Sequence, residues 1–233
     1  MGLFHSRRRQ VYPTRGEGGL ELEWIGNARV GEKLGEGVSC VVHAARFEDA
    51  DVALKLYKAG SIERHARLLG GELVEFEYRR NRAFFEAPGL GRYVARPLAY
   101  LSTAGVAAMV QERLDGRLYY DLYRDGEIGD EVFEHIREIV RLAHAAELFD
   151  VDLHAGNFLV VRDDSGERIP KMFDFNFIPF YLHPPNPAVW LGVQLGILDR
   201  AWRDRRKLKA FHDFTRMDRK RELFGKEGSD DRS

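Results

Sequence analysis

The chain is poor in cysteine: Cys40 is the only one among 233 residues. One thiol cannot form a disulfide within the chain, which excludes a disulfide-stabilised scaffold and suits a reducing compartment. An excess of charge is also lacking, since 36 Lys and Arg against 37 Asp and Glu leave a net charge of −1. Such a balance gives no general attraction to a polyanion, so we expect no nucleic acid as a partner.

Long apolar runs are missing from the sequence as well. The longest, residues 187–198, is too short to span a bilayer, and no secretory signal is recognisable. We therefore expect a cytoplasmic protein. The sequence contains no internal repeat, and its 44% hydrophobic residues, including 15 Phe, are enough for an ordinary globular core.

The most informative segment that the sequence does contain is Asp152-Leu-His-Ala-Gly-Asn157, followed after a short strand by Asp174-Phe-Asn176. ATP-dependent phosphoryl transfer needs one carboxylate to orient the acceptor hydroxyl, and an amide oxygen with a second carboxylate to hold magnesium against the phosphates. Few side chains suffice, because this catalysis consists mainly of positioning and charge neutralisation. The pattern predicts Asp152 as a catalytic residue and Asn157 and Asp174 as ligands of Mg²⁺.

Upstream, residues 34–42 are typical of a strand, a glycine turn and a second strand. Gly35 and Gly37 would let the backbone approach phosphates that any Cβ would keep at a distance. Cys40 stands where a GxGxxG pattern has its third glycine, and Val42 stands where an apolar residue contacts adenine. Taken alone, two glycines in a hairpin also fit an ordinary turn.

The next expected strand, residues 51–57, carries a lysine at its centre, Lys55. An inward lysine on an apolar strand is costly unless an anion meets it, and its separation from the glycine turn suits contact with the α- and β-phosphates. The alternative is an edge-strand lysine that faces water. The expected helix 72–87 offers two carboxylates as partners. Glu75 lies on a solvated face, whereas Glu77 shares its face with apolar residues and is predicted to pair with Lys55.

Together these motifs resemble the protein-kinase-like superfamily in their order and separation, over residues 26–182. The resemblance implies an α+β fold of two lobes around one cleft. The implied parts are a β-rich N-lobe at 26–111, a hinge at 112–116 and a reduced α-helical C-lobe at 117–224. Residues 1–25 are expected to form a flexible basic arm and residues 225–233 a disordered, charged tail.

The same resemblance implies the cofactors and their contacts. ATP and Mg²⁺ are the expected cofactors, and adenine would bind to backbone groups of Glu112 and Leu114. Gln111 would occupy the position of the gatekeeper residue. Lys55 and Glu77 would complete the catalytic set with Asp152.

The chain departs from Ser/Thr/Tyr protein kinases at several positions. Val151 replaces the arginine that reads a phosphorylated activation loop, and Asn176 replaces the glycine of Asp-Phe-Gly. No Ala-Pro-Glu motif follows, and the remaining segment is expected to be too short for a full peptide-binding platform. The ending His154-Ala-Gly-Asn157, with His154 expected to order the loop, instead resembles small atypical kinases. These are aminoglycoside phosphotransferases, RIO-type kinases, bacterial kinases of lipopolysaccharide core sugars and the PhoP-regulatory-network kinase-like family.

Hydrophobic periodicity and turn residues predict the remaining elements. Strands are expected near 29–34, 38–46, 51–57, 93–101 and 105–111, and helices near 72–87, 130–148, 188–199 and 201–222. Strand-like segments therefore precede helix-like ones, which is typical of an α+β protein.

The stretch 190–214 combines large apolar residues with basic ones: Arg203, Arg205, Arg206, Lys207 and Lys209. One hypothesis is peripheral contact with the inner surface of the membrane, through apolar insertion and attraction to anionic lipid. The alternative is a helix that packs its apolar stripe on the C-lobe and leaves a solvated basic face. Both explanations stay open.

We therefore expect an enzyme that transfers the γ-phosphate of ATP, with Mg²⁺, to a hydroxyl of a small molecule or glycolipid, such as a lipopolysaccharide core sugar. No obligate protein partner is inferred. One alternative is a pseudokinase that binds nucleotide without turnover, because the third glycine, the arginine and the Asp-Phe-Gly glycine are replaced. The other is a RIO-like protein serine kinase, which needs no activation segment.

Overall fold

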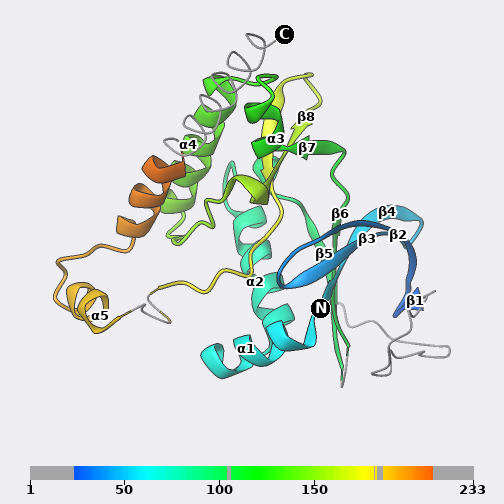
Figure 1. Ribbon diagram of the computed structural model, residues 1–233, viewed down its shortest axis with the longest axis horizontal. Coiled ribbons are helices and arrows are strands. Elements are labelled where there is room, and N and C mark those ends of the chain that lie inside the picture. Colours follow the sequence, from blue (N-terminus) through cyan, green and yellow to red (C-terminus); the bar gives the residue numbers. More distant parts are fainter. Residues whose placement is uncertain (1–23, 104–105, 181, 183–185, 212–233) are drawn as a thin grey trace, which may run out of the picture. The chain divides into compact units, whose positions relative to one another are not determined.

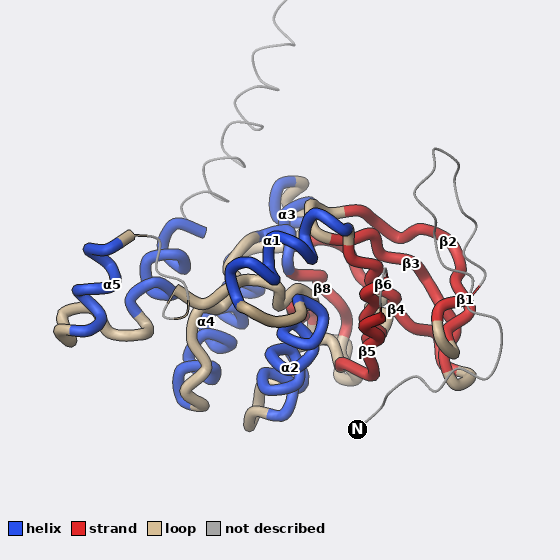
Figure 2. The backbone as a smooth tube through the Cα atoms, turned by 90° about the horizontal axis from the view of Figure 1, so that it is seen from below, coloured by secondary structure: helices blue, strands red, loops and turns tan. Residues whose placement is uncertain are grey.

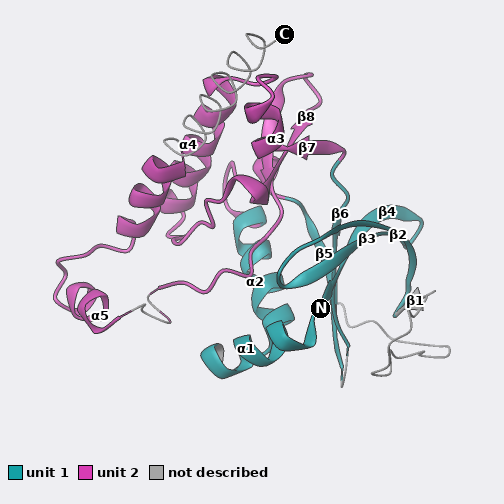
Figure 3. Ribbon diagram, viewed as in Figure 1, with its two compact units in different colours: residues 1–85, 95–114 teal, residues 86–94, 115–233 magenta. Residues whose placement is uncertain are grey.

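The computed structural model describes residues 24–103, 106–180, 182 and 186–211, which form an α+β architecture (Figure 1). The chain divides into two compact units (Figure 3). Unit 1 comprises residues 1–85 and 95–114, and unit 2 comprises residues 86–94 and 115–233. Each unit has its own antiparallel sheet. The predicted α+β class is confirmed.

Unit 1 is built on one six-stranded antiparallel sheet (Figure 2). In spatial order its strands are β1 (Trp24–Ile25), β2 (Ala28–Glu36), β3 (Cys40–Phe47), β4 (Ala50–Tyr57), β6 (Val106–Glu112) and β5 (Pro97–Thr103). Successive side chains of a strand point to opposite faces, and both faces of this sheet are apolar. One face carries a cluster that includes Val52 and Leu54, and the other carries a cluster with Tyr57 and Met109.

Two helices follow β4, namely α1 (Ala59–Leu69) and α2 (Leu73–Glu86). Helix α1 ends at Gly70, whose φ of 64° is left-handed and whose N–H bonds the carbonyl of Ala66. The first turn of α2 packs on the Tyr57 face of the sheet, because Leu73 and Val74 belong to the same apolar cluster as Tyr57. This packing decides which strand residues α2 can reach.

Most elements of unit 1 were predictable from sequence. The strands expected near 29–34, 38–46, 51–57 and 105–111 are confirmed as β2, β3, β4 and β6, and the helix near 72–87 is confirmed as α2. The strand expected at 93–101 is wrong at its start, since a 3₁₀ helix, η1 (Gly91–Tyr93), precedes β5. The cause is that Val94 makes an isolated bridge to Met172 instead of joining β5. Helix α1 was not predicted.

Unit 2 has a three-stranded antiparallel sheet in the order β7 (Gly116–Leu118), β8 (Phe158–Arg162) and β9 (Arg168–Met172). Its helical elements are η1, α3 (Tyr119–Arg124), α4 (Asp130–Ala145), η2 (Ala155–Asn157), α5 (Pro187–Gln194) and a helical segment at 202–211. Helix α4 buries the stripe Val132, Phe133, Ile136, Ile139, Val140 and Ala143. The helix predicted at 130–148 ends at Ala145, ahead of the left-handed Glu147. Of the helix predicted at 201–222, the part beyond 211 lies outside the described residues.

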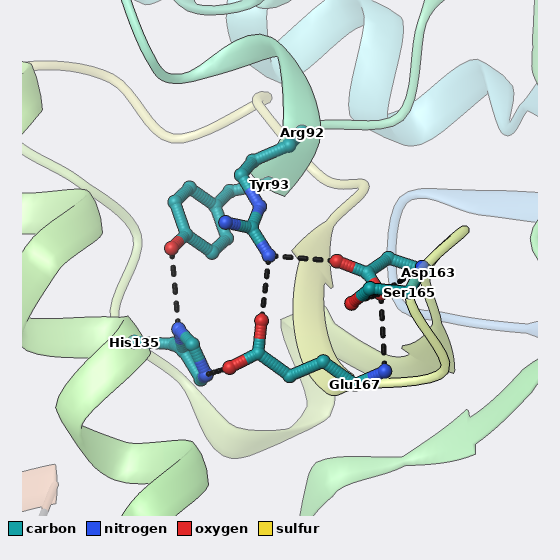
Figure 4. A network of polar contacts seen from close by, with 6 residues as sticks. All are labelled: Arg92, Tyr93, His135, Asp163, Ser165 and Glu167. Carbon is teal, nitrogen blue, oxygen red and sulfur yellow. Dashed lines mark hydrogen bonds and ion pairs between the residues drawn. The ribbon is translucent and has the colours of Figure 1, made fainter.

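A polar network ties η1 to α4 and to the turn between β8 and β9 (Figure 4). Arg92 donates to Asp163 at 2.7 Å and to Glu167 at 2.8 Å, and His135 lies 3.3 Å from Glu167. The Ser165 hydroxyl donates to Asp163 at 2.6 Å, and this bond is the main cause that lowers the pKa of Asp163. Asp163 therefore keeps its charge, and its ion pair with Arg92, to a lower pH than an isolated aspartate.

Candidate functional site

Lys55 and Glu77 form a buried ion pair in unit 1. Strand alternation puts Lys55 on the same face of β4 as Tyr57, the face on which α2 packs. Glu77 lies one turn beyond the packed start of α2, and its Oε1 is 2.6 Å from Nζ of Lys55. The side chains are 1% and 0% exposed. The predicted pairing is confirmed, and the alternative of a lysine facing water is wrong.

The register of the sheet places three predicted nucleotide-binding residues in one row. Gly35 on β2 pairs with Val42 on β3, and Val42 pairs with Lys55 on β4. Directly paired residues share a face, with their Cβ atoms about 5 Å apart. Val42 and Lys55 thus point to the same side of the sheet, with the backbone of Gly35 next to them.

Within the described part of the chain, a side chain larger than hydrogen would fit at both Gly35 and Gly37. A Cβ added to Gly35 would have no described neighbour within 4 Å, and one added to Gly37 would meet only the carbonyl oxygen of Cys40, at 3.9 Å. Neither glycine has a positive φ. Packing and backbone conformation therefore do not explain these glycines, whereas close approach of a ligand would.

The glycine turn is held in place by Lys58, at the start of α1. Its Nζ contacts Oε1 of Glu36 at 2.5 Å and donates to the carbonyl of Gly37 at 3.0 Å. Lys33 contacts the other oxygen of Glu36 at 2.6 Å. The hydrogen bonds from Lys33 and Lys58 lower the pKa of Glu36 to about 2, so this carboxylate stays ionised over the physiological range. The contact of Lys58 with the glycine turn was not predicted, although Lys58 directly follows the strand that carries Lys55.

Glu112 and Leu114, the predicted adenine contacts, lie where unit 1 ends. The N–H of Glu112 donates to the carbonyl of Arg96 at 2.8 Å, and Oε2 of Glu112 accepts from the N–H of Arg96 at 3.0 Å. The N–H of Glu112 is thus already bonded within the protein, and an adenine contact at this residue would use its carbonyl oxygen. Gln111, the expected gatekeeper, is 3% exposed.

In unit 2, both carboxylate oxygens of Asp152 accept hydrogen bonds. Asn157 Nδ2 donates to Oδ2 at 2.7 Å, and Lys207 Nζ donates to Oδ1 at 3.2 Å. The loop between Asp152 and Asn157 folds into η2, where His154 Nδ1 accepts from the N–H of Gly156 at 3.1 Å. The loop-ordering role predicted for His154 is confirmed. The Asp152 side chain is 20% exposed, so a solute can reach it.

The hairpin of β8 and β9 brings Asn157 and Asp174 to the same end of two paired strands. Asn157 immediately precedes β8, Asp174 follows β9, and the N–H of Phe173 donates to the carbonyl of Asn157 at 3.3 Å. The bond to Asp152 also fixes the amide of Asn157, because only Nδ2 can donate to a carboxylate. Oδ1 of Asn157 is therefore turned away from Asp152.

This pair of residues fits a magnesium ion. Mg²⁺ prefers oxygen ligands and commonly takes only one or two from the protein, with the rest from phosphates and water. One amide oxygen and one carboxylate match that requirement. The described residues contain no group of three or more His, Cys, Asp or Glu that could hold a metal without such help.

Two buried carboxylates that were not predicted from sequence support the Asp152 loop. Asp150 has a φ of 60° and is 0% exposed, and its Oδ2 accepts from the N–H of Phe180 at 2.9 Å. Oδ2 of Asp204 accepts from the N–H of Asp150 at 2.9 Å and lies 2.9 Å from His144 Nε2. These bonds connect the loop to α4 and to the helical segment 202–211. No local pattern marks Asp204, because its partners lie 54 and 60 residues away.

The basic residues of the C-terminal stretch divide between two environments. Arg203 and Lys207 lie over the ring of Phe177, at 4.1 and 3.9 Å from its centroid. On the same helical segment, three basic residues are exposed: Arg205, Arg206 and Lys209. Phe211 is 6% exposed and stacks on Phe133 of α4. The segment therefore packs on unit 2, in agreement with the second of the two hypotheses. Its basic side chains are not all solvated, however, because Arg203 and Lys207 contact Phe177.

Apolar side chains are exposed on α5 and just after it: Trp190 (52%), Leu191 (50%), Leu195 (62%) and Ile197 (73%). They precede the exposed basic residues of 202–211 in sequence. A helix of the length and apolar character needed to cross a bilayer does not occur among the residues described.

Unit 1 also contains a cavity of about 360 Å³ beside α1, the start of α2 and strands β5 and β6. Among its lining residues are Tyr57, Ile62, Leu73, Val74, Ser102 and Ala107. The cavity shares β4 and α2 with the Lys55–Glu77 pair but is lined by neither residue. It is thus separate from the predicted phosphate contacts.

The structure assembles the predicted site residues in two groups. Gly35, Val42, Lys55 and Glu77 lie together within unit 1, and Asp152, Asn157 and Asp174 lie together within unit 2. Compared with models of known protein families and with curated proteins, the chain matches none.

Proposed function

We propose that the chain is an ATP- and Mg²⁺-dependent phosphotransferase with a two-lobed, protein-kinase-like fold. The observation that carries this proposal is the buried pair of Lys55 and Glu77. Apolar residues of similar volume would stabilise the fold as well as a buried ion pair or better. A lysine held by a carboxylate at this position, in one row with Gly35 and Val42, is suited to the phosphates of a nucleotide.

In the proposed reaction, Lys55 contacts the α- and β-phosphates while Glu77 holds its side chain. Asp152 orients the acceptor hydroxyl and takes its proton as the acceptor oxygen bonds to the γ-phosphorus and the bond to the departing ADP oxygen breaks. Asn157 and Asp174 would hold Mg²⁺, which when bound neutralises charge on the phosphates. The hydrogen bond from Asn157 to Asp152 couples the metal ligand to the base.

We further propose a hydroxyl of a small molecule or glycolipid, such as a lipopolysaccharide core sugar, as the acceptor. The sequence lacks the Ala-Pro-Glu motif and the arginine that accompany a peptide-binding activation segment. A lipid-linked acceptor would also give a use to the exposed apolar residues of α5 and to the exposed basic residues that follow them. Both features support peripheral contact with an anionic membrane surface.

Sedimentation with lipid vesicles tests the membrane contact. We expect the protein to pellet with vesicles that contain anionic lipid, to pellet less with purely zwitterionic vesicles, and to lose affinity in Trp190→Ser. The physical reason is that apolar insertion and charge attraction act together. The contact is ruled out if neither lipid charge nor the Trp190 substitution changes the pelleted fraction.

Magnesium-dependent turnover of γ-labelled ATP tests the proposed function itself. We expect turnover by the wild-type protein and its loss in Asp174→Ala, while Asp164→Ala, an exposed aspartate of the β8–β9 turn, remains active. Label on an added sugar or glycolipid supports the acceptor class. Label on the chain itself would favour a RIO-like protein kinase instead. Bound ATP without turnover in any extract would favour a pseudokinase, in keeping with the residues that replace the third glycine and the Asp-Phe-Gly glycine.

A further inference from the structure

We propose that Lys207 is a positioning residue of the transfer site, supplied by the helical segment 202–211. Its ammonium group holds the carboxylate of Asp152 in one orientation and balances its charge. The proposal rests on the proposed function, in which Asp152 is the base that takes the proton of the acceptor hydroxyl. Nothing in the motifs around Asp152 points to Lys207, which lies 55 residues further along the chain.

Both oxygens of the Asp152 carboxylate accept a hydrogen bond, each from a different side chain. Lys207 Nζ lies 3.2 Å from Oδ1 of Asp152, while Asn157 Nδ2 lies 2.7 Å from Oδ2. Two donors from different elements fix the plane of the carboxylate. Each carboxylate oxygen can accept more than one hydrogen bond, so an acceptor hydroxyl can still donate to Asp152.

Lys207 differs from a lysine in an ordinary surface ion pair. Exposed pairs contribute little because both long side chains must be ordered for a weak, screened attraction. Here the ammonium group also lies 3.9 Å from the centroid of Phe177, which provides a cation–π platform. The side chain is only 28% exposed. Phe177 directly follows the Asp174-Phe-Asn176 segment, so Lys207 contacts both parts of the predicted unit 2 site.

The helical segment that carries Lys207 is itself anchored by buried residues. Asp204 is 0% exposed and bonds the N–H of Asp150, two residues before Asp152. Phe211, one turn after Lys207, packs edge-on against Phe158 at the start of β8, with ring centroids 6.0 Å apart. Anchors on both sides of Lys207 therefore tie the segment to the elements that carry Asp152 and Asn157. The ammonium group is placed before any ligand binds, as a preorganised charge must be.

The charge of Lys207 has a defined use during transfer. Before the reaction it compensates the negative charge of Asp152. When Asp152 takes the acceptor proton, the carboxyl becomes neutral and the negative charge is carried by the phosphoryl group and its new ester. The ammonium group attracts the carboxylate most strongly before the transfer, so its contribution is to positioning: it keeps Asp152 in one orientation until the acceptor hydroxyl donates its proton.

Steady-state kinetics of Lys207→Met, Lys207→Arg and Lys207→Ala test the inference. We expect kcat to fall by about 10²-fold in Lys207→Met, the loss that a small misplacement of a catalytic group can cause, with an unchanged KM for ATP. Lys207→Arg should keep a larger part of the activity. Added ethylammonium should restore part of the turnover of Lys207→Ala, because a small cation can occupy the space that the side chain leaves. Arg141→Met removes a positive charge from a 64% exposed position on α4 and should turn over normally.

The outcomes separate this inference from the proposed function. No turnover by the wild-type protein would overturn the proposed function and this inference with it. An active wild type whose Lys207→Met variant is equally fast, or faster, would overturn the role of Lys207 alone, and a faster variant would show that the contact inhibits. If Lys207→Met melts at a markedly lower temperature, its low activity has two explanations, a lost charge or a packing defect. Rescue of Lys207→Ala by ethylammonium distinguishes them, since a cation restores a missing charge but does not repair packing. Lack of any such rescue would then count against the proposal.

Discussion

The substitution Asp152→Asn is expected to slow phosphoryl transfer by about 10³-fold while leaving the affinity for ATP unchanged, because a general base contributes roughly 10²- to 10⁴-fold to such a step. The amide cannot take the proton of the acceptor hydroxyl. Nucleotide contacts are assigned to other residues, Gly35, Val42 and Lys55, which belong to unit 1. Binding and turnover should therefore separate in this variant.

The local geometry indicates that the loop keeps its conformation in Asp152→Asn. The side-chain oxygen of the new asparagine can accept from Nδ2 of Asn157, as Oδ2 of Asp152 does now at 2.7 Å. Its NH₂ group then faces Nζ of Lys207, and two donors cannot bond each other. The variant thus loses the base and the ion pair with Lys207, but keeps the bond that orients Asn157.

Two measurements check this prediction: initial rates with labelled ATP and a calorimetric titration with ATP. Asp164→Asn is the matched control, since it makes the same chemical change at an exposed position in the β8–β9 turn. A rate for Asp152→Asn within a few-fold of wild type would mean that Asp152 is not the base. Loss of ATP affinity together with the rate would mean that Asp152 serves binding or folding instead.

The contacts that could be predicted from sequence are those between residues whose elements have a clear periodicity or a short separation along the chain. Hydrophobic periodicity places Glu77 on the packed face of α2 and Lys55 on an apolar strand, and together these two facts predict their contact. The spacing within the Asp152 loop similarly predicts the ordering role of His154. The row of Gly35, Val42 and Lys55 was not predicted, because Gly35 was expected to follow the strand at 29–34, whereas β2 extends to Glu36 and pairs Gly35 with Val42.

Residues that act across long separations in sequence could not be predicted. Lys207 reaches Asp152 across 55 residues, and Asp204 reaches His144 across 60. In the sequence, both belong to a basic, aromatic stretch whose composition fits a solvated helix face or a membrane contact equally well. Only the packing of the helical segment 202–211 distinguishes Arg203 and Lys207 from their exposed neighbours. Likewise, Val94 left the expected strand because it pairs with Met172, far along the chain.

The second large effect is expected at the buried pair of unit 1. Lys55→Met should abolish measurable transfer, because the phosphates lose their positive partner, and should lower the free energy of unfolding by about 3–5 kcal/mol. The loss of stability has a separate cause: Glu77, which is 0% exposed, loses its ion pair with Lys55 while its side chain stays buried. Glu77→Gln should behave similarly, since it leaves Lys55 charged in an apolar strand.

The double substitution Lys55→Met with Glu77→Leu separates stability from function. With both charges removed, neither member of this pair is left as a buried ion, and apolar replacements of a buried pair are typically neutral or stabilising by about 1–4 kcal/mol. We therefore expect the double variant to unfold at a urea concentration equal to or above that of wild type. It should still transfer no phosphate.

A pair on the outer face of the same helix supplies the control. Glu75 and Arg79 are 2.6 Å apart and 35% and 76% exposed, and such a pair contributes about 0.5 kcal/mol. Glu75→Gln with Arg79→Met should therefore change neither unfolding nor turnover appreciably. If the Lys55–Glu77 double variant proves less stable than either single variant, the pair serves the fold, and the main support for a phosphotransferase is lost. If it is stable and inactive while the Glu75–Arg79 variant is stable and active, the buried charges are present for binding phosphate, since folding does not require them.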